Sequence, residues 1–113
     1  MKTGFVLVAV LFFSGCAAAP RAVVPPAAVD DPADAQELEE ALAELQQAKS
    51  ERVVSRAGSN CQGVCRASEL ICRASERICG IAGRHPGDPK YTERCRGAEA
   101  DCRDVQAECD RCQ

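Results

Sequence analysis

Eight cysteines between residues 61 and 112 constrain this chain more than any other feature. They form two sets with a central spacing of seven residues: Cys61, Cys65, Cys72 and Cys79, then Cys95, Cys102, Cys109 and Cys112. Because seven residues are close to two helical turns, each set lies on one stripe of an α-helix. The numbers of opposite members add to 174 in three pairs and to 173 in the fourth. A nearly constant sum is what an antiparallel helical hairpin requires.

The hairpin predicts four disulfides that cross between its arms. Cysteines seven residues apart on one helix are separated by about 10.5 Å, too far for the about 4.4–6.8 Å between the Cα atoms of a disulfide. The predicted pairs are Cys79–Cys95, Cys72–Cys102, Cys65–Cys109 and Cys61–Cys112. The last pair steps four residues on one arm and three on the other, a mismatch of about 1.5 Å along the axis. The layout resembles the disulfide-laced helical hairpins of the mitochondrial intermembrane space, which use a Cys-x9-Cys spacing instead.

Turn and capping signals set the ends of the two arms. Ser59 with Gln62 three residues later has the capping-box pattern that starts a helix. Gly80 and Gly83 are expected to end the first arm, residues 84–87 to form the turn, and Asp88–Pro89 to start the second arm as an N-cap followed by proline. Small residues on the seam should let the arms approach closely. These are Ser68, Ser75, Gly97 and Ala98.

A separate amphipathic helix is expected before the hairpin. Asp31–Pro32 is again an N-cap followed by proline, and Leu38, Leu42 and Leu45 share one face of a helix that runs to about Ala57. Acids crowd its front half and bases its back half, as the helix dipole prefers. The apolar stripe is narrow. This helix could pack on the hairpin, pair with a second copy as a short coiled coil, or form a stalk.

The N-terminal residues are expected to be a leader and a tether. After a charged start, residues 4–13 form an apolar run of about half the ~20 residues that a membrane-spanning helix needs. Residues 13–16 (Phe-Ser-Gly-Cys) resemble a bacterial lipobox, with Phe13 where that family usually has leucine. The resemblance implies cleavage before Cys16 and lipid on its sulfur. Residues 17–29 are rich in proline and alanine, which predicts an extended tether.

The odd number of cysteines favours this interpretation of Cys16. The chain has nine, and setting Cys16 aside leaves eight with matched partners. Two or more acyl chains on one residue hold a protein stably at a bilayer. By resemblance to lipoprotein sorting in enteric bacteria, Ala17 in place of aspartate favours the outer membrane. We therefore expect a bacterial cell-envelope protein whose folded part faces the periplasm or the cell surface.

Together these signals predict an all-α chain in four parts. These are a signal peptide at 1–15, the lipidated cysteine and tether at 16–30, an amphipathic helix at 31–58, and the cysteine-rich hairpin at 59–113. All three phenylalanines lie in the leader and the chain has no tryptophan, so the apolar core is thin. A small domain with such a core needs disulfides to be stable.

Metal binding is the main alternative function. Cys61, Cys65, Cys109 and Cys112 would converge at the open end of the hairpin, where four thiolates could bind zinc. A full row of thiols could also hold copper(I), as in the cysteine-lined helical bundles that store copper, which this chain resembles. The oxidising compartment outside the cytoplasm favours disulfides instead. A redox role for Cys109-x-x-Cys112 is less favoured, because reactive thiols are activated at helix N-termini and this motif ends a helix.

No pattern of catalytic residues is evident. The sole histidine, His85, stands in the turn and is expected to be solvated, and no phosphate loop or serine–histidine pattern appears. The net charge of −3 predicts neither a nucleic-acid-binding face nor an acidic tail. We expect a protein without catalytic activity, cofactor or small-molecule substrate, attached to a membrane and serving a structural or protein-binding role. Its exposed basic candidates are Arg66, Arg73, Arg77, Arg96 and Arg103.

Overall fold

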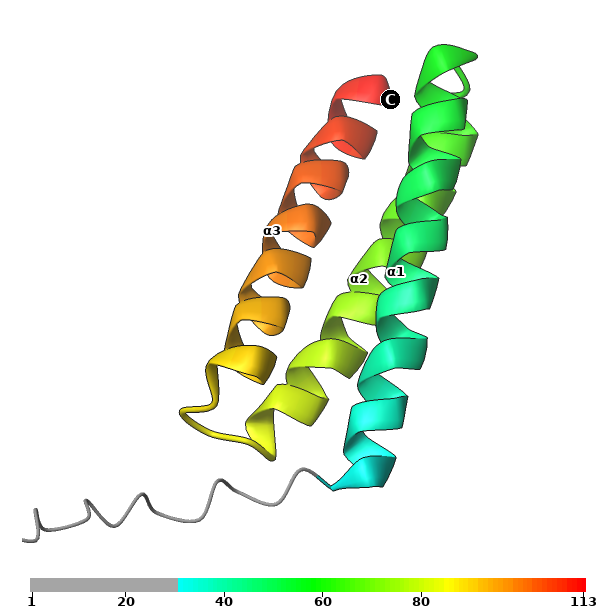
Figure 1. Cartoon of the computed structure of the whole chain (residues 1–113). Helices are drawn as coiled ribbons and strands as arrows, with labels where there is room; N and C mark the ends of the chain where they lie inside the picture. The colour runs from blue at the N-terminus through cyan, green and yellow to red at the C-terminus, as the bar shows by residue number, and fades with distance from the viewer. Residues whose placement is uncertain (1–30) are drawn as a thin grey trace, which may run out of the picture.

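The structure, a computed structural model, describes residues 31–113 as three helices. In chain order these are α1 (Pro32–Ala57), α2 (Cys61–Gly83) and α3 (Pro89–Cys112). Figure 1 shows α2 and α3 as an antiparallel hairpin, with α1 lying along it antiparallel to α2. The predicted all-α fold with its disulfide-stapled hairpin is confirmed. None of the three helices combines the length and apolar character needed to cross a membrane. The predicted signal peptide, Cys16 and tether lie outside the described residues.

Two of the three predicted helix starts have the expected caps. The Asp31 carboxylate accepts from the Ala33 amide at 3.0 Å, and Asp88 accepts from the Lys90 amide at 3.0 Å. The cap of α2 is one residue later than predicted: Asn60, not Ser59, accepts from the Gly63 amide at 2.9 Å. Ser59 is needed for the turn itself, where its φ of 53° is left-handed. The capping-box assignment was therefore wrong, and α2 starts one residue later than a cap at Ser59 would place it.

Two glycines allow the chain to reverse direction at the two ends of α2. Gly87, in the turn between α2 and α3, has a φ of 77°, which side chains other than glycine rarely tolerate. At the other end, Gly63 lies so close to α1 that a Cβ atom there would overlap the Ser55 side chain. The three-residue link at 58–60 therefore folds α2 directly back against α1.

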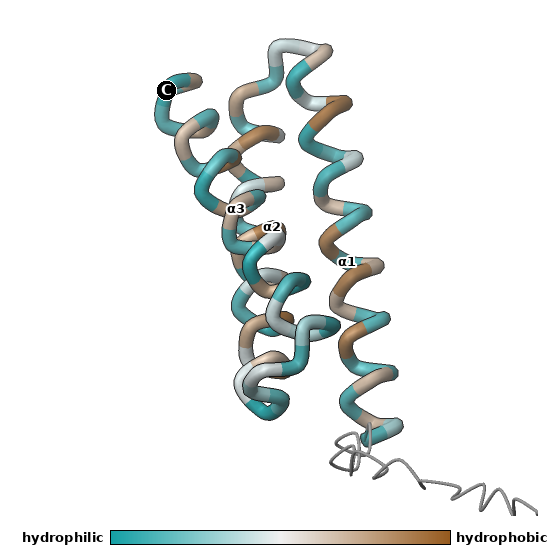
Figure 2. The backbone as a smooth tube through the Cα atoms, turned by 60° about the vertical axis from the view of Figure 1, so that its left-hand side comes forward, coloured by the Kyte–Doolittle hydropathy of each residue, from teal (hydrophilic) through white to brown (hydrophobic). Residues whose placement is uncertain are grey.

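The core lies mainly between α1 and α2. Leu38, Ala41, Leu45 and Ala48 are buried along α1, and their partners on α2 include Ile71, Ala74, Ile78 and Ile81. From α3, Tyr91, Ala98 and Val105 join the same cluster. Figure 2 shows hydrophobic segments recurring along α1 among hydrophilic ones. Of the three roles open to the first helix, the structure selects packing on the hairpin.

Candidate partner-binding surface

The disulfide seam makes the hairpin a rigid base for any binding surface. The bonds are the predicted pairs, with Cα–Cα distances of 4.6 Å for Cys79–Cys95, 4.7 Å for Cys72–Cys102, 4.8 Å for Cys65–Cys109 and 5.4 Å for Cys61–Cys112. Packed helices normally lie about 8–10 Å apart, so α2 and α3 approach closely along this line. The widest pair is the one with unequal steps on its two arms.

Three of the four small residues predicted to permit this approach are buried. Ser68, Ser75 and Ala98 have exposed fractions of 7%, 5% and 1%. Gly97 is different, because it is exposed and an added Cβ would meet no atom within 4 Å. The prediction was wrong for Gly97, which lies beside the groove between α1 and α3 rather than on the seam.

The sulfurs considered as metal ligands are all used in disulfides. At the open end, Cys61 is bonded to Cys112 and Cys65 to Cys109, and a sulfur in a disulfide is not the thiolate that zinc or copper(I) prefers. Cys109 and Cys112 are bonded to different partners rather than to each other. The Cys-x-x-Cys pattern is therefore not a redox pair in this structure.

A cluster of charged and aromatic groups ties the start of α1 to the turn after α2. The Asp34 carboxylate is 2.6 Å from Arg84 Nη2 and 2.8 Å from His85 Nε2. Hydrogen bonds from Arg84 and then His85 lower the pKa of Asp34 to about 2. The His85 side chain is only 8% exposed, and its ring stacks on Tyr91 with centroids 3.9 Å apart. The expectation of a solvated His85 was wrong, because the start of α1 packs against the loop that carries His85 and its Asp34 contacts the ring.

A second set of ion pairs joins the back half of α1 to α3. Glu108 accepts from Arg52 Nε at 2.6 Å and from Arg56 Nη2 at 2.7 Å, while Lys49 Nζ is 2.8 Å from Asp101. The hydrogen bonds from Arg56 and Arg52 lower the pKa of Glu108 to about 2. The acids in the front half of α1 and the bases in its back half therefore do more than complement the helix dipole. They also form ion pairs with both arms of the hairpin. Aligning an acidic front half with the basic end of an antiparallel α2 could have predicted the Asp34 cluster.

Arg77 belongs to the internal contacts rather than to a free basic surface. Its guanidinium lies between three glutamates of α1, with Nη1 2.8 Å from Glu44, Nη2 3.4 Å from Glu40 and Nε 3.8 Å from Glu37. These acids, Glu44 foremost, raise the pKa of Arg77. The prediction of Arg77 as an available contact was therefore wrong.

The other four arginines predicted as contacts are exposed. Arg66 and Arg73 follow seam cysteines on α2, and Arg96 and Arg103 do so on α3. Within residues 31–113 none of the four takes part in an ion pair, so their guanidinium groups are available to a partner.

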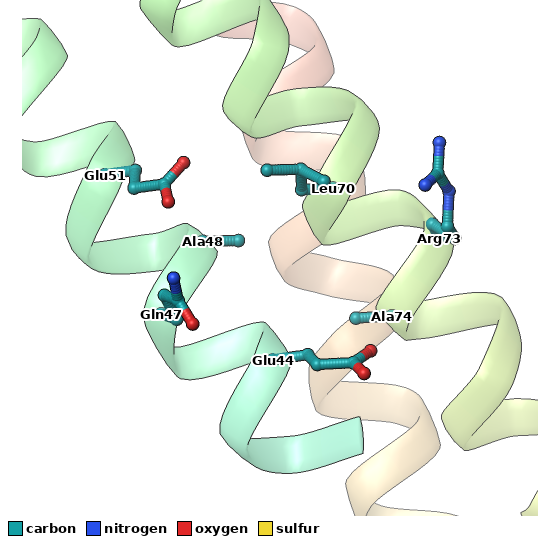
Figure 3. Close-up of a pocket in the computed structure, with 7 residues that line it drawn as sticks. All are labelled: Glu44, Gln47, Ala48, Glu51, Leu70, Arg73 and Ala74. Carbon is teal, nitrogen blue, oxygen red and sulfur yellow. The ribbon is translucent and has the colours of Figure 1, made fainter. Parts of the chain in front are cut away.

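Two shallow grooves flank α1 where it rests on the hairpin. The groove between α1 and α2, about 360 Å³ in volume, is lined at its base by Ala48, Leu70 and Ala74. In Figure 3, Glu51 and Leu70 point toward each other across it, whereas Arg73 points away. The second groove, about 290 Å³, lies between α1 and α3 beside Lys49. Neither has the enclosed shape of a small-molecule site, so α1 forms a ridge with a shallow channel on each side.

Comparison of the chain with protein-family models, curated proteins and solved structures finds no match.

Proposed function

We propose that this chain is a non-enzymatic lipoprotein of the bacterial cell envelope, anchored by lipid on Cys16, whose helical bundle has a structural or partner-binding role. The observation that carries the proposal is the pairing of cysteines. Eight of the nine are joined in four disulfides within residues 61–112. This leaves Cys16, at the position where the lipobox resemblance implies lipid attachment. Disulfides persist outside the cytoplasm, so four of them favour an exported protein.

The arrangement of reactive side chains favours binding over catalysis. The imidazole of His85 is held between Asp34 and Tyr91 and is nearly covered. The described cysteines are bonded in pairs, so none of them offers a thiolate nucleophile. What the bundle does present is a rigid surface with unpaired arginines and two shallow grooves.

The position of the chain ends suits an anchored display. In Figure 1 the start of α1 lies at the same end of the bundle as the turn between α2 and α3, and the C-terminus lies at the opposite end. α1 has 26 residues and rises about 1.5 Å per residue, so the far end stands about 39 Å from the start of α1. A lipid-anchored chain would present that end, with the link between α1 and α2, to the surrounding compartment.

Metabolic labelling with an alkyne-tagged fatty acid in a bacterial host tests the anchor. We expect label on the wild-type chain, none on the Cys16→Ser variant, and accumulation of the unprocessed chain when lipoprotein signal peptidase is inhibited. Fractionation of inner and outer membranes tests the location, with Ala17→Asp expected to shift the chain toward the inner membrane. An unlabelled wild-type chain, or equal labelling of Cys16→Ser, would refute the anchor.

A further inference from the structure

The outer face of α1 carries an uncharged stripe that neither α2 nor α3 covers. The stripe consists of Ala43, Gln46, Gln47, Ser50, Val53, Val54 and Ala57, all of them exposed. At about 100° per residue, these positions lie within about 60° of Ser50 on the helix surface. Val53 is 63% exposed and Val54 73%, and no other large hydrophobic residue in the described part of the chain is exposed. Glu39 ends the stripe on its N-terminal side.

The stripe repeats with a period of seven residues. Ala43, Ser50 and Ala57 form its central line, Gln46 and Val53 recur on one side, and Gln47 and Val54 recur on the other. A seven-residue repeat keeps the same face of a helix toward a partner helix over several turns. Small residues on the central line would let that helix approach closely. The leucines of α1 already face the hairpin, so this outer stripe is a second packing surface.

The two edges of the stripe carry opposite charges. Glu40, Glu44 and Glu51 follow one edge, and Lys49 and Arg56 follow the other. In a parallel pair of α1 helices, related by a twofold axis along the helices, the acidic edge of one copy faces the basic edge of the other. In an antiparallel pair the axis runs across the helices, and acid would face acid. Charge complementarity therefore favours the parallel pair, as it does at the flanking positions of coiled coils.

Glu51, which is half-buried beside the groove between α1 and α2, is the acid on this edge whose charge is not already paired within the chain. Glu40 and Glu44 already contact Arg77 of the same chain, whereas Glu51 has no ion-pair partner within residues 31–113. Lys49 and Arg56 pair with Asp101 and Glu108, but both remain partly exposed, with side-chain exposures of 39% and 58%. Each could bridge its internal carboxylate and the Glu51 carboxylate of a second copy.

We propose that two copies of this chain pair in parallel through the outer stripe of α1. A contact of about four helical turns is smaller than the about 1,200–2,000 Å² of a standard stable interface, so the pair should dissociate in dilute solution. A parallel pair also places both N-termini at the same end, as attachment to one membrane would require. The charge argument holds without the anchor, and Cys16 labelling reports on the anchor separately.

Sedimentation equilibrium over a concentration series tests the pairing. The sample is the chain purified from a bacterial envelope in density-matched detergent. We expect a reversible monomer–dimer equilibrium for wild type. Ser50→Arg should abolish it, because the substitution places a charge at the centre of the contact, while circular dichroism should show unchanged helicity because Ser50 is exposed. A chain that stays monomeric throughout, or a dimer that Ser50→Arg leaves intact, would overturn the proposal.

Charge reversal at Glu51 tests the orientation. In the parallel pair, Glu51→Lys replaces attraction by repulsion on both edges and should weaken dimerisation about fivefold or more. The matched control is Glu99→Lys on α3, which reverses an exposed glutamate of the hairpin without an ion pair among the described residues. It should leave the equilibrium unchanged. In an antiparallel pair centred on Ser50, the two copies of residue 51 would face each other, so Glu51→Lys would replace one like-charge contact by another. A dimer that this variant leaves unchanged or tightens would therefore overturn the proposal.

Discussion

The contact between α2 and α3 differs in kind from the contact between α1 and the hairpin. Four covalent bonds hold α2 and α3 with paired Cα atoms 4.6–5.4 Å apart. α1 has no such bond. It is held by buried residues such as Leu38 and Leu45 and by ion pairs at both of its ends. The geometry of the hairpin is therefore fixed covalently, whereas the position of α1 depends on burial and charge and should respond to mutation and pH.

Reduction of all four disulfides should have the largest effect on stability. It breaks the covalent bonds between α2 and α3, so that both helix contacts are then noncovalent. Single disulfides contribute about 2–4 kcal/mol, although bonds in one hairpin do not add fully. Since residues 31–113 contain no phenylalanine or tryptophan, we expect the remaining core to be insufficient and the helical circular dichroism to collapse. The intact mass should rise by eight hydrogens, two for each of the four bonds. Full helicity after complete reduction would show that packing alone holds the hairpin.

Leu38→Ala should have the next largest effect and should act on α1 alone. Leu38 is 2% exposed, and replacing a buried leucine by alanine typically costs about 2–5 kcal/mol. Hydrogen exchange should show lost protection in residues 32–57, with α2 and α3 still protected. Gln36→Ala, which truncates an exposed residue on the same helix outside the outer stripe, serves as the control and should change little. Equal loss of protection in all three helices would show a single cooperative unit instead.

Acidification should release α1 without unfolding the hairpin. The pKa values of Asp34 and Glu108 are lowered from 3.8 and 4.5 to about 2, so their pairing favours the folded state above about pH 4.5. This contribution is lost as the pH falls from there toward 2. Hydrogen exchange or NMR should show α1 losing protection in that window while α2 stays protected.

The double variant Asp34→Asn/Glu108→Gln is the control for the acid effect. In this variant α1 should be less protected from hydrogen exchange at neutral pH. Its protection should also depend less on pH between pH 4.5 and 2. An unchanged acid transition in this variant would assign the effect to other carboxylates.

Arg77→Gln should have the smallest effect of the set. Its guanidinium contacts three glutamates, but it is 33% exposed, and exposed ion pairs contribute little net stability because water and salt screen them. We expect the melting temperature to fall by at most a few degrees, with the difference shrinking as salt is added. A loss larger than that of Leu38→Ala would mean that charge, rather than burial, holds α1.

The hairpin could be predicted because covalent geometry leaves few solutions. Sulfurs repeating every seven residues on two arms, with a turn between them, allow one mirror-related set of cross-links. The helix starts at Asp31–Pro32 and Asp88–Pro89 could also be predicted, since an N-cap followed by proline is a local signal. Only the cap of α2 was displaced, because Ser59 was needed in the turn.

The docking of α1 and the environment of His85 could not be predicted in the same way. A narrow leucine stripe is compatible with packing on the hairpin, with pairing to a second copy and with a stalk. Packing on the hairpin is favoured by the short link at 58–60 and by contacts such as Arg52–Glu108, which join residues 56 positions apart. The sequence predicts a solvated His85 because its neighbours form a loop between two helices. Its burial depends instead on the start of α1, which is distant in sequence.

The difference between the covalent and the noncovalent contact has a mechanical consequence. Tension applied between Asp31 and a partner held on α2 or α3 would pass through α1, which has no covalent link to the hairpin except the short loop at 58–60. Once peeled off, the 26 residues of α1 could extend to the order of 90 Å at about 3.3–3.6 Å each, while the cross-linked arms could not lengthen. The first helix would then be the extensible part of the molecule, and the cross-linked hairpin the part that keeps its length under tension.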